Sequence, residues 1–171
     1  MNYNIHPILV HFPIALLFIY SIIKVLPLSK WFPAVIWKHI ERALLVFGFL
    51  GALLANATGE TAQHLTHPLR ALVDAHATFA GISIGLYGLL LAGEFFAVIN
   101  SEYKKFIPTG IIQKFVDYFE KLLCNPIFSN ILAILGLIAI STTGLLGGVM
   151  VYGKTADPLA GIVLNLLGIN I

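Results

Sequence analysis

Four stretches of the chain are long and apolar enough to cross a lipid bilayer. They cover residues 7–26, 43–62, 75–100 and 126–152, and a spanning helix needs about 20 such residues. The composition agrees, since 58% of the 171 residues are hydrophobic and only 11% are charged, against about 25% charged in a soluble domain. We therefore predict an all-α membrane protein, a single four-helix transmembrane bundle over residues 1–171.

Basic residues are concentrated on one side of these predicted spans. Eight lie in or beside the loops that join spans one to two and three to four, whereas the other side has only Arg70 and Lys154: Lys24, Lys30, Lys38, Arg42, Lys104, Lys105, Lys114 and Lys121. The positive-inside rule then places the Lys-rich loops in the cytoplasm and both termini outside. We expect a multi-pass protein of the cell (inner) membrane. The formal net charge of +2 is too small to suggest nucleic acid as a partner.

Two shorter segments carry helical patterns outside the spans. In the cytoplasmic loop, apolar residues recur at helical spacing from Ile111 to Leu122, which predicts an amphipathic helix with Thr109 as its N-cap. We expect this helix to lie in the membrane interface, and docking of a partner is the alternative. In the tail, Asp157 and Pro158 predict the start of an outer helix over Pro158–Leu167. That helix lies on the outer surface or against a neighbouring subunit, and a homo-oligomer is left open.

Five of the six histidines fall on the outer side of this topology: His6, His11, His64, His67 and His76. At 1.5 Å rise per residue, His11 lies roughly 10 Å and His76 roughly 15 Å outward from the centres of their spans. A polar side chain at such depth usually faces the bundle interior and has a partner. The structural interpretation of His11 is a hydrogen bond to the Leu9 carbonyl, which Pro13 leaves without a helical donor.

The functional interpretation is binding of a cofactor. Two histidines from facing helices make a low-spin electron-transfer site for haem, so His11 and His76 are the candidate axial ligands of one haem b. His6, Arg70 and Lys154 are candidate partners of its propionates. The glycines, including Gly81 and Gly148, either let helices pack closely or leave room for a flat cofactor.

A non-haem metal is the alternative cofactor. Zn or Cu would draw on more ligands from the same outer group, with Glu60 and His64 joining His11 and His76. Glu60 and His64 are four residues apart and share one helical face. Glu60 and Asp74 are also the acidic candidates to hold the second ring nitrogen of a ligating histidine.

Several motifs resemble a known family. The stretches HPILVHFPIALL, ATGETAQHL, AHATFA and GGVMVYG are similar to predicted bacterial and archaeal membrane proteins that carry domain of unknown function 2231. The motif positions that match lie on all four spans: His6, His11, Pro13, Gly59, His76, Gly147, Gly148 and Tyr152. The resemblance implies the four-span fold and outward histidines, and it favours a haem-binding or respiratory role. In the family a further histidine often follows the glycine pair, where this chain has Lys154.

These observations lead to three hypotheses of function. The first is a b-type haem protein for electron transfer, a subunit or partner of a respiratory or redox complex. The second is a non-haem metal-binding membrane protein, and the third is a structural or anchoring subunit without a cofactor. No pairing of a nucleophile with a base is evident, because Ser83 and Ser141 lie in apolar helices where a hydroxyl usually bonds to its own backbone. We do not expect an enzyme.

Overall fold

The computed structural model describes residues 4–66, 68–103 and 110–171. Within them the chain is helical, and the elements follow in this order: α1 (His6–Val25), α2 (Leu28–Trp31), α3 (Trp37–Thr66), α4 (Arg70–Glu102), α5 (Ile111–Leu123), α6 (Pro126–Tyr152), the 3₁₀ turn η2 (Gly153–Ala156) and α7 (Ala160–Leu166). The helices α1, α3, α4 and α6 are each long and apolar enough to cross a membrane. They coincide with the four predicted spans.

The helices α3 and α4 extend beyond the predicted spans at both ends. The helix α3 begins six residues before residue 43 and ends four residues after residue 62. The added turns carry charged and polar side chains, among them Lys38, Arg42 and His64. A helix can continue out of the hydrocarbon layer because its backbone hydrogen bonds do not depend on the solvent. Hydropathy therefore marks the buried part of each helix and not its ends.

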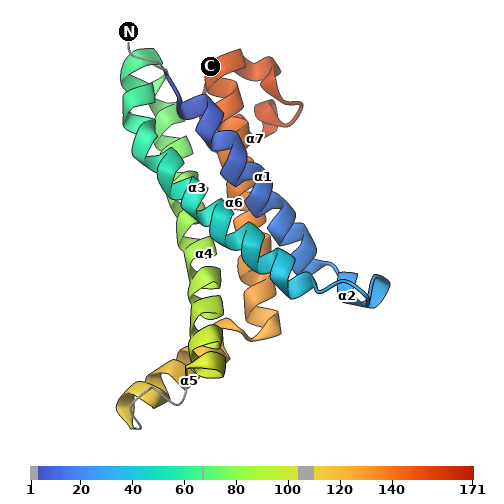
Figure 1. Cartoon of the computed structure of the whole chain (residues 1–171). Helices are drawn as coiled ribbons and strands as arrows, with labels where there is room; N and C mark the ends of the chain where they lie inside the picture. Colours follow the sequence, from blue (N-terminus) through green and yellow to red (C-terminus); the bar gives the residue numbers. More distant parts are fainter. Residues whose placement is uncertain (1–3, 67, 104–109) are drawn as a thin grey trace.

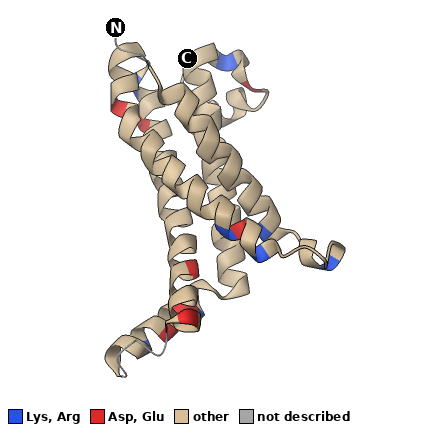
Figure 2. Ribbon diagram, viewed as in Figure 1, with Lys and Arg blue, Asp and Glu red and all other residues tan. Residues whose placement is uncertain are grey.

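The described chain has two ends with different character. The beginning of α1, the end of α3, the start of α4 and the C-terminus lie together (Figure 1), and we call this the His end because it carries His6, His64 and His76. The opposite end carries α2, α5, Lys24, Lys38 and Arg42, and we call it the Lys end. Figure 2 shows charged residues near the two ends and few along the middle of the bundle, as a spanning protein requires.

The four long helices pack as two tight pairs, α1 with α3 and α4 with α6, and the contact of α1 with α6 joins the pairs. The most extensive contacts are those of α1 with α3 and of α4 with α6, followed by α1 with α6. The helices α3 and α4 contact each other less, and they diverge from the His end toward the Lys end (Figure 1). Where α3 and α4 diverge, a groove lies between them.

The centre of the bundle is organised around Tyr87 of α4, which is fully buried. Its hydroxyl lies 2.8 Å from Ser21 Oγ and donates to the Leu17 carbonyl at 3.2 Å, so one phenol ties α4 to α1. Its ring meets Tyr20 edge-on, with centroids 6.1 Å apart, and lies against Gly136 of α6. Buried polar groups inside a membrane bundle need such partners, and this network supplies them.

Most glycines of the spans serve close packing of helices. An added Cβ would meet a side chain of another helix or of the turn η2 within 3.6 Å at eight of them: Gly48, Gly51, Gly88, Gly93, Gly136, Gly144, Gly147 and Gly148. Gly51 faces Pro13. Gly81 and Gly85 are different, because an added Cβ at either would meet nothing within 4 Å. The GxxxG pair is thus not used for packing within the described part of the chain.

The amphipathic helix predicted in the third loop is present as α5. Phe115 and Phe119 pack on Phe96 of α4, with centroids 6.0 and 5.6 Å away, and Ile111 and Tyr118 remain exposed. Thr109, the predicted N-cap, lies outside the described residues, and α5 follows Gly110 without a side-chain cap.

The tail helix begins later than predicted. The helix α7 starts at Ala160 rather than at Pro158, because Asp157 closes a turn: its Oδ1 accepts from Leu159 N at 2.7 Å. The tail also packs on its own chain. Ala160, Leu164 and Ile169 are buried against residues of α4 and α6 that include Leu72 and Leu146. The C-terminal segment therefore closes one flank of the His end.

Candidate functional site

At the His end, histidines join the long helices in two pairs, His76 between α4 and α6 and His6 between α1 and α3. His76 of α4 is half-buried, and its Nδ1 lies 3.0 Å from the carbonyl oxygen of Thr143 in α6. A carbonyl only accepts, so Nδ1–H is the donor and the tautomer of the neutral ring leaves the lone pair on Nε2. The Cε1 atom of His76 would lie 3.4 Å from an added Cβ at Gly147. The glycine thus allows the imidazole to pack directly on α6.

His6 at the start of α1 is held in a similar way. Its Nδ1 lies 2.9 Å from Thr58 Oγ1 in α3, and the same hydroxyl donates to the Ala55 carbonyl at 2.9 Å. Because that hydroxyl proton is used, the oxygen accepts from His6 Nδ1–H, and Nε2 again carries the free lone pair. His6 Cε1 lies 3.7 Å from the Cβ that Gly59 would carry. His6 and His76 thus lie at the same end of the bundle, His6 held between α1 and α3 and His76 between α4 and α6.

His11 does not face the bundle interior as its depth in the first span suggested. It is exposed, on the side of α1 that also exposes Ile8 and Phe12. Its Nδ1 donates to the Pro7 carbonyl one turn earlier, not to the Leu9 carbonyl. Depth along a helix axis gives no information about the direction of a side chain around that axis. Of the histidines on the first and third spans, His6 and His76 are therefore the two that are partly buried, and His11 is exposed.

The other predicted site residues lie at the surface of the His end. Glu60 and His64 form an exposed pair on α3, with 3.9 Å between Oε1 and Nε2. Arg70 is 4.0 Å from Asp74 on α4, and both side chains are mostly exposed. Lys154 lies exposed in η2. His67 falls outside the described residues.

Gly81 and Gly148, the candidate packing surfaces for a cofactor, do not lie against His6 or His76. Gly148 faces Ala156 of η2, 3.6 Å from an added Cβ. Gly81 lies on an open face of α4. Across residues 4–66, 68–103 and 110–171, no three His, Cys, Asp or Glu side chains are grouped so that they could hold a metal ion.

Sequence reasoning missed Thr58 and Thr143, which hold the two histidines. Neither acidic candidate takes this role, since Glu60 pairs with His64 and Asp74 with Arg70. Thr143 acts through its backbone carbonyl, for which no sequence signal exists. Thr58 could have been suspected from the sequence. A hydroxyl in an apolar helix commonly donates to a carbonyl of its own backbone, and its oxygen can then still accept a hydrogen bond from a histidine.

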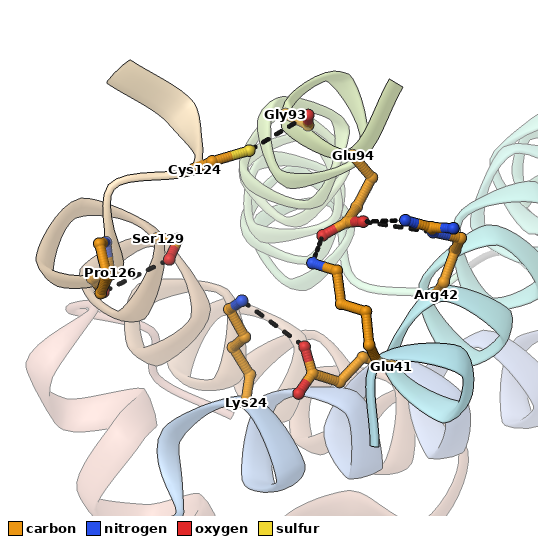
Figure 3. Close-up of polar contacts among 9 residues, drawn as sticks. Lys24, Glu41, Arg42, Gly93, Glu94, Cys124, Pro126 and Ser129 are labelled. Atoms are coloured by element: carbon orange, nitrogen blue, oxygen red, sulfur yellow. Dashed lines mark hydrogen bonds and ion pairs between the residues drawn. The ribbon is translucent and has the colours of Figure 1, made fainter. Parts of the chain in front are cut away.

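A second polar cluster lies at the Lys end (Figure 3). Glu94 of α4 is largely buried, and it accepts from Lys38 and from Arg42, the latter at 3.3 Å between Nη2 and Oε2. Lys24 of α1 pairs with Glu41 of α3 at 3.5 Å. The two cations on Glu94 come from α3, so this carboxylate ties α3 to α4 where the two helices diverge. Partly buried charges of this kind are stable only when they are paired.

Cys124, next to this cluster, provides a test of its electrostatics. Its Sγ donates to the Gly93 carbonyl at 3.3 Å, and partial burial with Glu94 nearby raises the pKa of the thiol. The thiolate is the nucleophile, so a raised pKa lowers the reactive fraction at a given pH. We expect iodoacetamide to alkylate Cys124 several-fold more slowly than a model peptide at about pH 8, with the rate still rising at higher pH.

Mass spectrometry of the alkylated protein across a pH series would measure this. Glu94→Gln removes a negative charge near the thiol and is expected to speed the reaction. A wild-type rate that equals that of the peptide and levels off at the same pH would contradict the prediction.

No curated protein and no solved structure matches the chain. One family model, described as a predicted membrane protein (DUF2231), matches residues 2–157. The match includes all four long helices together with His6, His11 and His76, and it confirms the resemblance inferred from the motifs. The chain belongs to the DUF2231 family of predicted membrane proteins.

Proposed function

We propose that this protein binds one haem b at the His end and transfers electrons as a subunit or partner of a membrane redox complex. The observation that carries the proposal is the arrangement of His76. Its Nδ1–H donates to the Thr143 carbonyl and its Nε2 is left with a free lone pair. Ligating histidines almost always have their other ring nitrogen held in this way, and haem iron takes neutral imidazole as an axial ligand.

His6 is the better second ligand for this proposal. It is half-buried and held by Thr58, with Nε2 free, and it comes from a different helix than His76. His11, the ligand favoured by depth alone, faces away from His76 within the chain and would serve only through a second copy or another subunit. Bound haem would supply one-electron chemistry, and two imidazoles suffice to hold it. A zinc or copper site needs more ligands, which makes haem the better fit to this pair.

Other residues of the His end would isolate such a site from water. The tail packs Leu164 and Ile169 over Leu72 and Leu146, which closes one flank with apolar side chains. Arg70 and Lys154 are exposed at the same end and would be available to propionates. A dry site strengthens electrostatic interactions within it, which suits a group whose charge changes on reduction.

The proposal also includes an orientation. The Lys end carries Lys24, Lys38 and Arg42, so the positive-inside rule places it in the cytoplasm and the His end outside. The exposed apolar face of α5, with Ile111 and Tyr118, would then lie in the inner interface of the membrane. Electrons would therefore be exchanged near the outer face, with a partner there.

A second candidate function is a structural or anchoring subunit without a cofactor. The observation that favours it is that His6, His11 and His76 each have a hydrogen-bond partner within the chain. In this case the imidazoles would only join helices. The two candidates differ in whether Nε2 of His76 has an iron atom to bind.

The experiment is a dithionite-reduced minus oxidised absorbance spectrum of protein purified in detergent from haem-replete cells, with a pyridine haemochrome assay. We expect a sharp α-band and one haem b per chain. Colourless protein would contradict the proposal. Elemental analysis of the same sample would then distinguish a bound metal from the cofactor-free subunit.

A further inference from the structure

The groove between α3 and α4 has the form of a lipid-binding site. It has a volume of about 540 Å³ and opens sideways from the bundle toward the Lys end. Eight of its ten lining residues are uncharged and almost all are apolar: Val46, Phe49, Leu50, Gly88, Leu91, Ala92, Phe95 and Val98. The other two, Arg42 and Glu94, are the ion pair of the second polar cluster.

The dimensions of the groove match one leaflet of a bilayer. On α4 the lining extends from Gly88 to Val98, which is roughly 15 Å at 1.5 Å rise per residue. The hydrocarbon core of a membrane is about 30 Å thick, so one leaflet takes half of that. Leu50 and Phe95 are 50% and 61% exposed, so the groove is accessible from the side, where an acyl chain would enter.

The charges beside the groove favour an anion. Lys38 and Arg42 share the single carboxylate of Glu94, whereas Lys24 has its own partner in Glu41. Two cations against one carboxylate leave one positive charge uncompensated. Arg42 lines the groove and its side chain is still 39% exposed, so it can bind a further oxygen, while Lys38 lines a separate small pocket and offsets the charge of Glu94 from there. A phosphate accepts such charge-assisted hydrogen bonds well.

We propose that this groove is a specific site for an anionic phospholipid, with one acyl chain along α4 and the phosphate on Arg42. A quinone would fill the same apolar volume, but its neutral head leaves the excess positive charge without a partner. A zwitterionic lipid offers a phosphate together with a cation that opposes binding. The site lies at the opposite end from His76 and does not depend on haem.

The binding test uses native mass spectrometry of the delipidated protein with added lipids. Dioleoyl phosphatidylglycerol and dioleoyl phosphatidylcholine have the same chains and differ in charge. We expect one phosphatidylglycerol per chain, bound at least about tenfold more tightly than phosphatidylcholine, which corresponds to one charge-assisted hydrogen bond. Equal affinity for the two lipids, or displacement of the lipid by a short-chain ubiquinone, would overturn the proposal.

Two pairs of variants locate the binding. Arg42→Gln removes a charge at the groove and is expected to abolish the preference for phosphatidylglycerol, whereas Lys30→Gln, on the exposed α2, is expected to keep it. Ala92→Leu fills the groove and is expected to weaken both lipids by about tenfold or more, whereas Ala77→Leu, exposed on the same helix, leaves them unchanged. Lys38→Gln replaces Arg42→Gln if the latter does not fold.

Three further results would overturn the proposal. Glycerol 3-phosphate that competes as well as the whole lipid would show a headgroup site without a role for the groove. A dimer that dissociates on Ala92→Leu would show that a second copy fills the groove. Lipid binding that is unchanged by both groove variants would place it elsewhere on the surface.

Discussion

Alanine at position 76 is expected to abolish the proposed binding of haem. In the proposed site His76 would hold the iron through its imidazole, and alanine offers neither an imidazole nor any other donor. The haem content should fall from one per chain to near zero, and the α-band of the reduced-minus-oxidised spectrum should disappear. The pyridine haemochrome assay measures this loss directly.

A glutamine at the same position separates ligation from folding. In His76→Gln the side-chain amide can still donate to the Thr143 carbonyl, which lies 3.0 Å from Nδ1 in the wild type. Glutamine is a poor ligand for haem iron. We therefore expect this variant to elute as monodisperse protein with little change in thermal stability, but without haem. Haem at wild-type level in His76→Gln would contradict ligation by His76.

The second ligand is identified by comparing His6→Ala with His11→Ala. His6 is partly buried at the same end of the bundle as His76 and is held by Thr58, so in the proposed site its loss should convert a low-spin spectrum into a high-spin one or release the haem. His11 is exposed and bonds to its own helix, so its loss should leave the spectrum unchanged. The reverse result would mean that a second chain completes the site, because His11 faces outward.

The four spans were predictable because membrane insertion depends on a property that can be counted along the chain. A stretch of about 20 apolar residues is sufficient, and the predicted ranges coincide with α1, α3, α4 and α6. The helix α5 was predictable for a related reason, since its apolar residues recur at helical spacing. The docking of the tail could not be predicted in this way. The sequence around Leu164 and Ile169 is apolar, but it does not specify whether these side chains pack against Leu72 or against another subunit.

The candidate site was only partly predictable. Grouping the histidines at one end followed from topology, but choosing among them by depth ignored their direction around the helix. The buried face of α1 carries Pro13, Leu17, Tyr20 and Ser21, and His6 lies seven residues before Pro13, on the same face. His11 is two residues before Pro13, about 200° away at 100° per residue. A polar residue such as Ser21 in an apolar span marks the interior face, so this signal was present in the sequence.

The partners of the histidines show a limit of a different kind. The Thr143 carbonyl that holds His76 belongs to the backbone, and every residue of α6 has such a carbonyl. Which of them meets the imidazole depends on the register of α4 against α6, which is set by contacts such as Tyr87 with Gly136. The position of His76 is therefore determined by packing about two turns or more away.

That packing contact leads to a second large expected effect. Gly136→Ala should lower the free energy of unfolding by about 1–3 kcal/mol, the usual cost of overpacking a core. An added Cβ would lie 2.9 Å from Tyr87 Cζ, and the ring cannot easily retreat. The Tyr87 hydroxyl is hydrogen-bonded to Ser21 and to the Leu17 carbonyl. The rings of Tyr20 and Tyr87 also meet in an edge-on arrangement, with their centroids 6.1 Å apart. Thermal unfolding in detergent measures the loss.

Gly81→Ala is the matched control for this variant. It makes the same change in another spanning helix, where an added Cβ meets nothing within 4 Å. Alanine is favoured over glycine within a helix by about 1 kcal/mol, so the control should be neutral or slightly stabilised. A loss of equal size in both variants would attribute the effect to glycine itself and not to Tyr87.

A double-mutant cycle tests the mechanism of the effect. In Tyr87→Phe the ring loses its bonds to Ser21 and Leu17 and is free to shift away from α6. Gly136→Ala should then cost less in this background than in the wild type, with a coupling of about 0.5 kcal/mol or more, as expected for residues in contact. Strictly additive costs would mean that the hydroxyl does not fix the ring. Coupling would instead show that the link from α1 through Tyr87 to α6 sets how closely the helices approach, and so where α6 presents the Thr143 carbonyl to His76.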